Sequence, residues 1–246
     1  MTNVSKPDTL TVVLGLLTAS ALTACGGTSS AFEPGAGNDT GGGTGTLRIE
    51  GSISADSNRP NAELAADFTT EFRIRIQLNG VTVTTGEVTV TSASGSFPLT
   101  YSSQNNNDWE GAAPGYDEVY GLDVVSGADE VTGVRVDGPD IHTFSAPLMG
   151  ATVDSTLVLD LAWDRRQAAD TASLDVPEID TIAITDSGTY ALSAGALKAK
   201  PDQAETNELR LRRANRVIPA GATVGSEVAV SIRTEIDVVA QPNPAL

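Results

Sequence analysis

The side chains in this sequence that could carry chemistry are few and stand far apart. Cys25 is the only cysteine and His142 is the only histidine. A thiol can accept a lipid or bind a metal, and an imidazole can act as a base or as a metal ligand. The third candidate is the polar segment 102–117, in which two aromatic residues stand among carboxylates and amides.

Cys25 ends an apolar stretch near the start of the chain. Residues 9–24 are almost uncharged, and at roughly 16 residues they are too short to cross a hydrocarbon core of ~30 Å. They fit the apolar region of an export signal, which ends in small residues. A secretory signal with an incidental cysteine is the alternative to a lipid-accepting Cys25.

The residues around the cysteine carry a family resemblance. Leu22-Thr23-Ala24-Cys25 resembles the lipobox of bacterial lipoproteins, in which a branched apolar residue and two small residues precede the cysteine. The resemblance implies a diacylglycerol on the Cys25 sulfur and an acyl chain on its new amino group, and two or more such chains anchor a protein stably. Because Gly26 rather than an aspartate follows, it also implies the outer membrane as the location.

A glycine-rich stretch follows the cysteine. Residues 25–46 contain one aromatic residue, Phe32, and almost no branched aliphatic ones, so they cannot bury enough apolar surface to offset the entropy of ordering the chain. A flexible coil of ~20 such residues has a reach of roughly 25 Å. We therefore expect residues 1–24 to be a signal peptide and residues 25–46 to be a flexible tether.

The chain is strongly acidic, with a formal net charge of −17 at pH 7. Such a charge disfavours binding to nucleic acid, whose phosphates attract basic surfaces. It also repels anionic lipid headgroups, so we expect the membrane contact to run through the lipid on Cys25 and not through a basic patch. The acidity is most simply a solubility device, and cation binding is the alternative.

Period-two alternation of apolar and polar residues predicts strands through most of the chain. Residues 72–78 are the clearest example. Asn79-Gly80 after them is the strongest short hairpin signal, because a type I′ turn needs positive φ at both central residues. Residues 62–68 could form one or two helical turns. Further strand-like runs are 47–53, 81–83, 87–90, 119–125, 131–136, 141–145, 156–163, 179–185, 207–213 and 227–239.

Many short strands with turn signals between them favour an all-β fold of one or two immunoglobulin-like β-sandwiches. A change of pattern near residues 146–154 predicts a boundary there. We expect one β-sandwich domain over 47–147 and a second, immunoglobulin-like one over 148–246. A single larger sandwich is the alternative.

Two motifs in the second half carry a further resemblance. The run from Leu157 to Trp163 looks like an immunoglobulin strand that ends in a core tryptophan, and Asp186 to Tyr190 looks like the Asp-x-Gly-x-Tyr element of those domains. In that family the tyrosine hydroxyl closes a corner onto the backbone, and the tryptophan packs on a disulfide that this chain cannot form. A similar arrangement recurs in uncharacterised bacterial lipoproteins, which implies a fold and a location rather than an activity.

The sequence offers little for catalysis. A lone His142 cannot build the usual zinc site, and a serine triad would have to recruit it, although no Gly-x-Ser-x-Gly elbow is present. His142 is most simply a surface or inter-strand hydrogen-bonding residue. A carboxylate-dependent hydrolase stays open, but its cleft is usually lined by aromatic residues, which make up only 4% of the chain. We expect no enzyme, no cofactor and no metal.

Segment 102–117 is the best candidate for ligand binding. A polar loop with two aromatic rings on a rigid scaffold could stack a sugar ring or grip a peptide. The same residues could coordinate calcium, although their spacing does not match an EF-hand. Alternatively, the rings plug the end of a sandwich and the asparagines form turns. The candidate ligand-binding residues are Trp109, Tyr116, Asp108, Glu110 and Asp117.

Four arginines cluster between residues 210 and 216. In a strand, Arg210 and Arg212 share one face, with Leu209 and Leu211 on the opposite face. A solvated face paired to local carboxylates is the simplest interpretation. A docking site for an acidic partner or for lipopolysaccharide phosphate is the alternative.

Together these features predict a lipid-anchored protein of the bacterial cell envelope with a non-catalytic structural or interaction role. Binding of a carbohydrate or a peptide through segment 102–117 is the alternative function, and a hydrolase is a more distant one. The expected partners are the membrane, through the lipid on Cys25, and an envelope protein or glycan. The sequence does not specify an oligomeric state.

Overall fold

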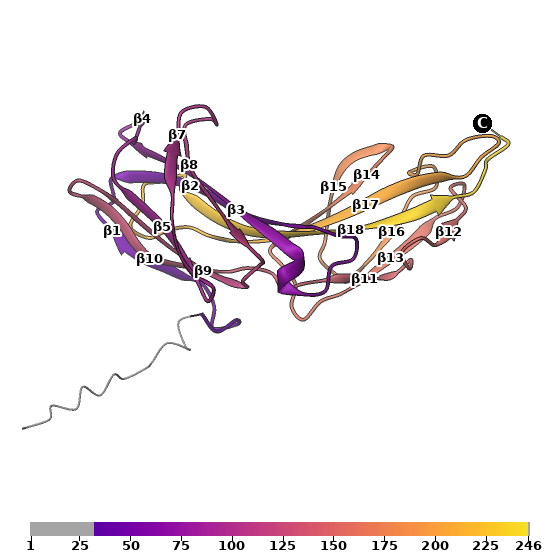
Figure 1. Cartoon of the computed structure of the whole chain (residues 1–246), viewed down its shortest axis with the longest axis horizontal. Coiled ribbons are helices and arrows are strands. Elements are labelled where there is room, and N and C mark those ends of the chain that lie inside the picture. Colours follow the sequence, from indigo (N-terminus) through magenta and orange to yellow (C-terminus); the bar gives the residue numbers. More distant parts are fainter. Residues whose placement is uncertain (1–31, 246) are drawn as a thin grey trace, which may run out of the picture. The chain divides into compact units, whose positions relative to one another are not determined.

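The structure, a computed structural model, describes residues 32–245. The predicted signal peptide 1–24 and Cys25 lie outside the described residues. The expected all-β class is confirmed, because the described residues form strands and one short 3₁₀ helix, η1 (Figure 1). The elements are β1 (Asp39–Gly43), β2 (Leu47–Ser57), η1 (Ala65–Asp67), β3 (Phe68–Leu78), β4 (Val81–Thr82), β5 (Glu87–Ser92), β6 (Gly95–Pro98), β7 (Thr100–Ser102), β8 (Asp108–Pro114), β9 (Val119–Ser126), β10 (Asp129–Asp137), β11 (Thr143–Ala146), β12 (Thr152–Val153), β13 (Leu159–Asp164), β14 (Thr171–Val176), β15 (Ile179–Ile184), β16 (Thr189–Leu192), β17 (Glu205–Val217) and β18 (Glu227–Ala240).

The strands of the described residues form three sheets. One has five strands in the order β1-β10-β9-β5-β6, and one has three strands in the order β11-β13-β16. The third sheet has ten strands, with β15-β14-β17-β18-β2-β3-β8-β7 as its main path. This large sheet packs against the five-stranded sheet over a first hydrophobic core and against the three-stranded sheet over a second.

Strand β3 shows how the sequence builds the large sheet. Successive side chains of a strand point to opposite faces, and in β3 every second residue is buried: Phe68, Thr70, Phe72, Ile74 and Ile76. The hairpin predicted after it is confirmed. Asn79 and Gly80 both have positive φ, at 52° and 80°, and β4 pairs back onto β3.

Strands β17 and β18 connect the two cores. They pair without a break from Glu205, opposite Ala240, to Val217, opposite Val228. Along the buried face of β17, Leu209 belongs to the second core and Val217 to the first. One pair of long strands therefore contributes apolar side chains to both cores.

The parallel pairing of β18 with β2 brings the two halves of the chain together. It covers Glu227 to Arg233 and places the last strand beside the first strand of the large sheet. The division of the chain at residue 147 stays a prediction. The structure adds that the first core draws on the C-terminal part of the chain, through Val217, Val228, Val230 and Ile232.

The predicted flexible tether over residues 25–46 is corrected over residues 39–43. These residues form β1 and pair antiparallel with β10. Glycine here permits a close approach of backbones, because a Cβ on Gly43 would lie 2.2 Å from the Glu130 carbonyl oxygen. Composition alone cannot distinguish a glycine-rich coil from an edge strand of this kind.

Candidate functional site

About half of the predicted ligand loop 102–117 lies in strands, and residues 103–107 form turns. Asp108–Pro114 forms β8, which pairs with β3 on one side and with β7 on the other. Trp109 lies in the first core with 5% of its surface exposed, and its indole N–H donates to the Val83 carbonyl oxygen at 3.0 Å. A sugar can stack only on an exposed ring face, and Trp109 offers none in this structure.

Tyr116 follows β8 and is also buried, with 4% of its surface exposed. Its hydroxyl donates to the Pro139 carbonyl oxygen at 2.6 Å, and its ring lies 6.1 Å from that of Phe68. Burial raises the pKa of Tyr116 well above its ordinary value. Both aromatic residues of the segment therefore act as core residues whose polar atoms are satisfied by backbone carbonyls.

The three predicted carboxylates bind residues of the chain itself. Asp108 accepts a hydrogen bond from Arg75 Nε at 3.0 Å, and Asp117 accepts one from the Ser92 hydroxyl at 2.6 Å. Glu110 accepts a hydrogen bond from the Asn105 amide at 2.9 Å. The five residues proposed from the sequence thus do not converge on one opening, and their placement agrees with the packing alternative.

The structure instead reveals a buried group of polar residues between the two cores, here called the polar seam. It consists of Asp140, His142, Asp186, Arg213 and Thr234, none of them more than 7% exposed. On β17, Arg213 lies between Leu211 of the second core and Val217 of the first. On β18, Thr234 holds the equivalent place.

Arg213 is the centre of the polar seam. Its side chain is 0% exposed, and it donates to Asp186 Oδ2 at 2.9 Å and to Asp140 Oδ1 at 3.2 Å. Although burial opposes the charge of Asp186, hydrogen bonds from the Ala169 N–H, the Trp163 indole and Arg213 lower the pKa of this carboxyl. The two motifs noted in the second half therefore meet here, since Trp163 Nε1 donates to Asp186 Oδ1 at 2.9 Å.

His142 is part of this seam and lies wholly inside the protein. Its Nε2 lies 3.2 Å from the Leu211 carbonyl oxygen, so it bonds to the backbone of β17 as an inter-element residue and not as a surface one. Burial, followed by the positive charge of Arg213, lowers the pKa of His142 to about 4. The imidazole is therefore neutral near pH 7.

The remaining arginines of the 210–216 cluster lie on the outer face of the large sheet. Arg210 pairs with Glu208 and, at 3.5 Å, with Glu235. Arg212 lies 3.8 Å from Asp56, and Arg216 lies 3.4 Å from Glu227. They pair with local carboxylates, and exposed pairs of this kind contribute about 0–1 kcal/mol each.

The sequence held a signal for the buried arginine. Arg213 has the same parity along β17 as Leu209 and Leu211, so the alternation that places those leucines inward places Arg213 inward as well. Asp140 and Asp186 lie in loops far away in sequence, and no local pattern joins them to Arg213.

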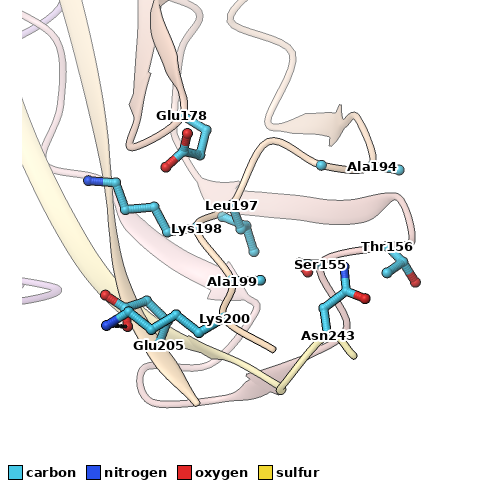
Figure 2. Close-up of a pocket in the computed structure, with 11 residues that line it drawn as sticks. Ser155, Thr156, Glu178, Ala194, Leu197, Lys198, Ala199, Lys200, Glu205 and Asn243 are labelled. Carbon is cyan, nitrogen blue, oxygen red and sulfur yellow. Dashed lines mark ion pairs between the residues drawn. The ribbon is translucent and has the colours of Figure 1, made fainter. Parts of the chain in front are cut away.

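A pocket of about 660 Å³ lies at the end of the second core. Its walls include the loop between β16 and β17, the turn between β14 and β15, and the C-terminal segment (Figure 2). We call it the lysine pocket, because it holds Lys198 and Lys200, the only lysines among the described residues. Its lining residues include Glu178, Ala194, Lys198, Lys200, Glu205 and Asn243.

Only some of the charged side chains that line the lysine pocket are ion-paired. Lys200 Nζ pairs with Glu205 Oε2 at 2.6 Å. Within the part of the chain that the structure describes, Lys198 and Glu178 form no ion pair with any residue. Figure 2 shows both of their charged groups on the same side of the loop, with Asn243 on the other side.

Hydrogen bonds from other parts of the chain to its backbone hold the loop that carries the two lysines in place. The side-chain amide of Asn207, which is buried, accepts a hydrogen bond from the Lys198 N–H at 2.6 Å and donates one to the Lys198 carbonyl oxygen at 2.9 Å. The Asn243 N–H donates to the Lys200 carbonyl oxygen at 2.7 Å. Leu197 is buried in the second core. The pocket wall is thus preformed while the Lys198 ammonium extends into solvent.

Among residues 32–245, no three or more histidine, cysteine, aspartate or glutamate side chains come together as a metal site would require. The same residues contain no helix long and apolar enough to cross a membrane. No protein-family model matches the chain, and no curated protein is detectably similar to it in sequence. Any function must therefore be argued from the residues themselves.

Proposed function

We propose that the protein is a lipid-anchored, non-catalytic binding module of the bacterial cell envelope, and that it binds its ligand in the lysine pocket. The observation that carries the binding role is the pocket itself: about 660 Å³ is within the ~300–1,000 Å³ range of small-molecule sites. The anchor is carried by the sequence around Cys25, and the outer membrane is its proposed location.

The segment before β1 is attached to the five-stranded sheet. The N–H groups of Gly35 and Gly37 donate to Asp137 Oδ2, both at 3.0 Å, which attaches this segment to the end of β10. Residues 35–43 therefore belong to the folded structure, and they follow the proposed anchor residue Cys25 in sequence.

The lysine pocket lies far from this attachment. The amide of Asn38 donates to the Arg216 carbonyl oxygen, near one end of β17, whereas Glu205, at the other end of β17, lines the pocket. Eleven residue steps of strand separate the two, which is about 36 Å at ~3.3 Å per residue. The geometry supports a module whose pocket lies at the opposite end of β17 from the segment around Asn38.

The anchor is tested by metabolic labelling with a fatty-acid analogue. The wild-type protein is expected to take up label, and Cys25→Ala to take up none. Equal labelling of the two proteins would show that Cys25 is not the lipid acceptor.

The binding role is tested by a thermal-shift screen against peptides, sugars and lipid headgroups. Ala194 lines the pocket, so Ala194→Trp should fill it and remove the shift that a bound ligand causes. Val81→Trp is the matched control, because Val81 is 70% exposed on β4, which pairs with β3 and is far from the pocket in the sheet order. Ligands whose shifts survive Ala194→Trp unchanged would contradict binding in this pocket.

A further inference from the structure

We infer that the lysine pocket takes a zwitterionic ligand of the size of a short peptide, with its carboxylate on Lys198 and its ammonium on Glu178. The inference rests on the proposed binding role of the pocket and adds the chemistry of the ligand. It uses a different part of the protein from segment 102–117, whose aromatic rings are buried.

The charges of the pocket favour a ligand that carries both signs. The two lysines, Lys198 and Lys200, are balanced by Glu178 and Glu205. The formal charges of these four side chains therefore sum to zero, in a chain of formal charge −17. Lys200 and Glu205 satisfy each other. One cation and one anion remain for a ligand, and a zwitterion matches both.

Other ligand classes fit these walls less well. A purely anionic ligand would approach a strongly acidic protein against its overall field. A purely cationic ligand would meet two lysines. A neutral sugar usually stacks on an aromatic ring, and no aromatic side chain lines the pocket in the part of the chain that the structure describes.

The pocket is also preorganised for this task. Asn207 fixes the backbone of Lys198 on both its N–H and its carbonyl sides. Glu178 stands in the two-residue turn Pro177-Glu178, which Val176 and Ile179 close by pairing across β14 and β15. Because both Cα positions are set by strands of the large sheet, only the two side chains must order when a ligand binds.

The size of the pocket favours a peptide over a single amino acid. At about 660 Å³ the pocket is in the upper half of the range of small-molecule sites. Ala194 contributes exposed apolar surface to the pocket. A peptide has apolar side chains and two charged ends, which match this surface and the charges of Lys198 and Glu178.

The test uses the full-length protein in detergent micelles and isothermal titration with tri-alanine. Four probes are compared: the peptide with free termini, its C-terminal amide, its N-acetyl form and the neutral disaccharide maltose. We expect the free peptide to bind and each blocked form to bind about tenfold more weakly, since a charge-assisted hydrogen bond contributes ~1.5–3 kcal/mol. Lys198→Gln should weaken the free peptide about tenfold and leave the amide unchanged. Glu178→Gln should weaken the binding of the free peptide about tenfold and leave the binding of the N-acetyl form unchanged.

Arg73→Gln and Glu71→Gln are the matched controls, because both residues are exposed on β3 and pair with each other at 3.0 Å. Equal binding of free and blocked peptides, or unchanged binding in Lys198→Gln and Glu178→Gln, would overturn the inference. Maltose binding that is lost in Ala194→Trp but unaffected by Lys198→Gln would overturn the zwitterion and leave the proposed pocket function intact. Failure of all four probes to bind would overturn the zwitterion, and the thermal-shift screen with Ala194→Trp would then decide the pocket function separately.

Discussion

Replacement of Arg213 by methionine tests whether the polar seam holds the two cores together. The guanidinium donates to Asp186 at 2.9 Å, to the Asp140 carboxylate at 3.2 Å and to the Asp140 carbonyl at 2.9 Å, and it also donates to the Gln167 carbonyl. Methionine fills similar space but removes every one of these donors. Breaking a buried pair by removing one partner costs about 3–5 kcal/mol, so we expect the free energy of unfolding to fall by that amount.

Urea unfolding followed by tryptophan fluorescence measures this change. Trp109 lies in the first core and Trp163 in the second, so the emission reports on both. With a denaturant dependence of ~1–3 kcal/mol per molar urea, the midpoint should fall by at least about 1 M. Trp163 donates directly to Asp186 and should show the change first.

Arg212→Met is the matched control, one residue earlier on the same strand. Its side chain is 38% exposed and lies 3.8 Å from Asp56, so its loss should cost no more than about 1 kcal/mol. In the Arg213→Met background, Asp186→Asn should cost ~0.5–3 kcal/mol less than it does alone. If Arg213→Met lowers the free energy of unfolding no more than Arg212→Met does, the polar seam does not stabilise the fold and the reasoning is wrong.

Three further predictions concern single residues. The pKa of His142 is about 4 in the folded protein and about 6.5 in the unfolded chain, so the free energy of unfolding should fall by about 2 kcal/mol between pH 7 and pH 5. Urea unfolding of the wild type at both pH values should show this loss. An equal loss in His142→Gln would refute the assignment to His142. Trp109→Ala should destabilise the protein by about 3–5 kcal/mol, and a change under 1 kcal/mol in urea unfolding would contradict a core role. Gly43→Val should break the pairing of β1 with β10, because its Cβ would lie 2.2 Å from the Glu130 carbonyl oxygen. We expect faster amide hydrogen exchange at residues 40–43. Unchanged exchange would show that these residues are not paired with β10 and form a flexible tether.

Local patterns predicted the strands well where alternation was strong. The runs 72–78, 119–125 and 227–239 lie within β3, β9 and β18, and the Asn79-Gly80 turn has the positive φ values that its residue types favour. Each of these signals depends only on neighbours in sequence, since alternation sets which side chains share a face of a strand.

The same patterns were wrong where a segment had an unusual composition. Residues 102–117 looked like a polar loop because asparagines and carboxylates dominate them, yet Trp109 supplies enough apolar surface to hold β8 against β3. Residues 39–43 looked like a coil because they are rich in glycine. There the missing side chains allow the backbone of β1 to approach that of β10.

The candidate site was beyond sequence reasoning for a different reason. Lys198, Glu178 and Asn243 belong to a loop, a turn and the C-terminal segment, and none of them forms a motif with its neighbours. The residue that positions Lys198 is Asn207, which reaches back nine residues through two hydrogen bonds. Only the folded chain shows that they share one pocket.

The sequence by itself determined the all-β class, most of the strands and the faces their side chains share, because these follow from the alternation of neighbouring residues. The resemblance of residues 22–25 to a lipobox, on which the proposed anchor depends, is likewise drawn from the sequence alone. The tertiary structure decided that β18 pairs in parallel with β2 and that one sheet backs both cores. It also decided that Arg213 is compensated by Asp140 and Asp186. Strand partners and charge partners are chosen by contacts between distant segments, and the energy of a buried charge depends on which of them it meets.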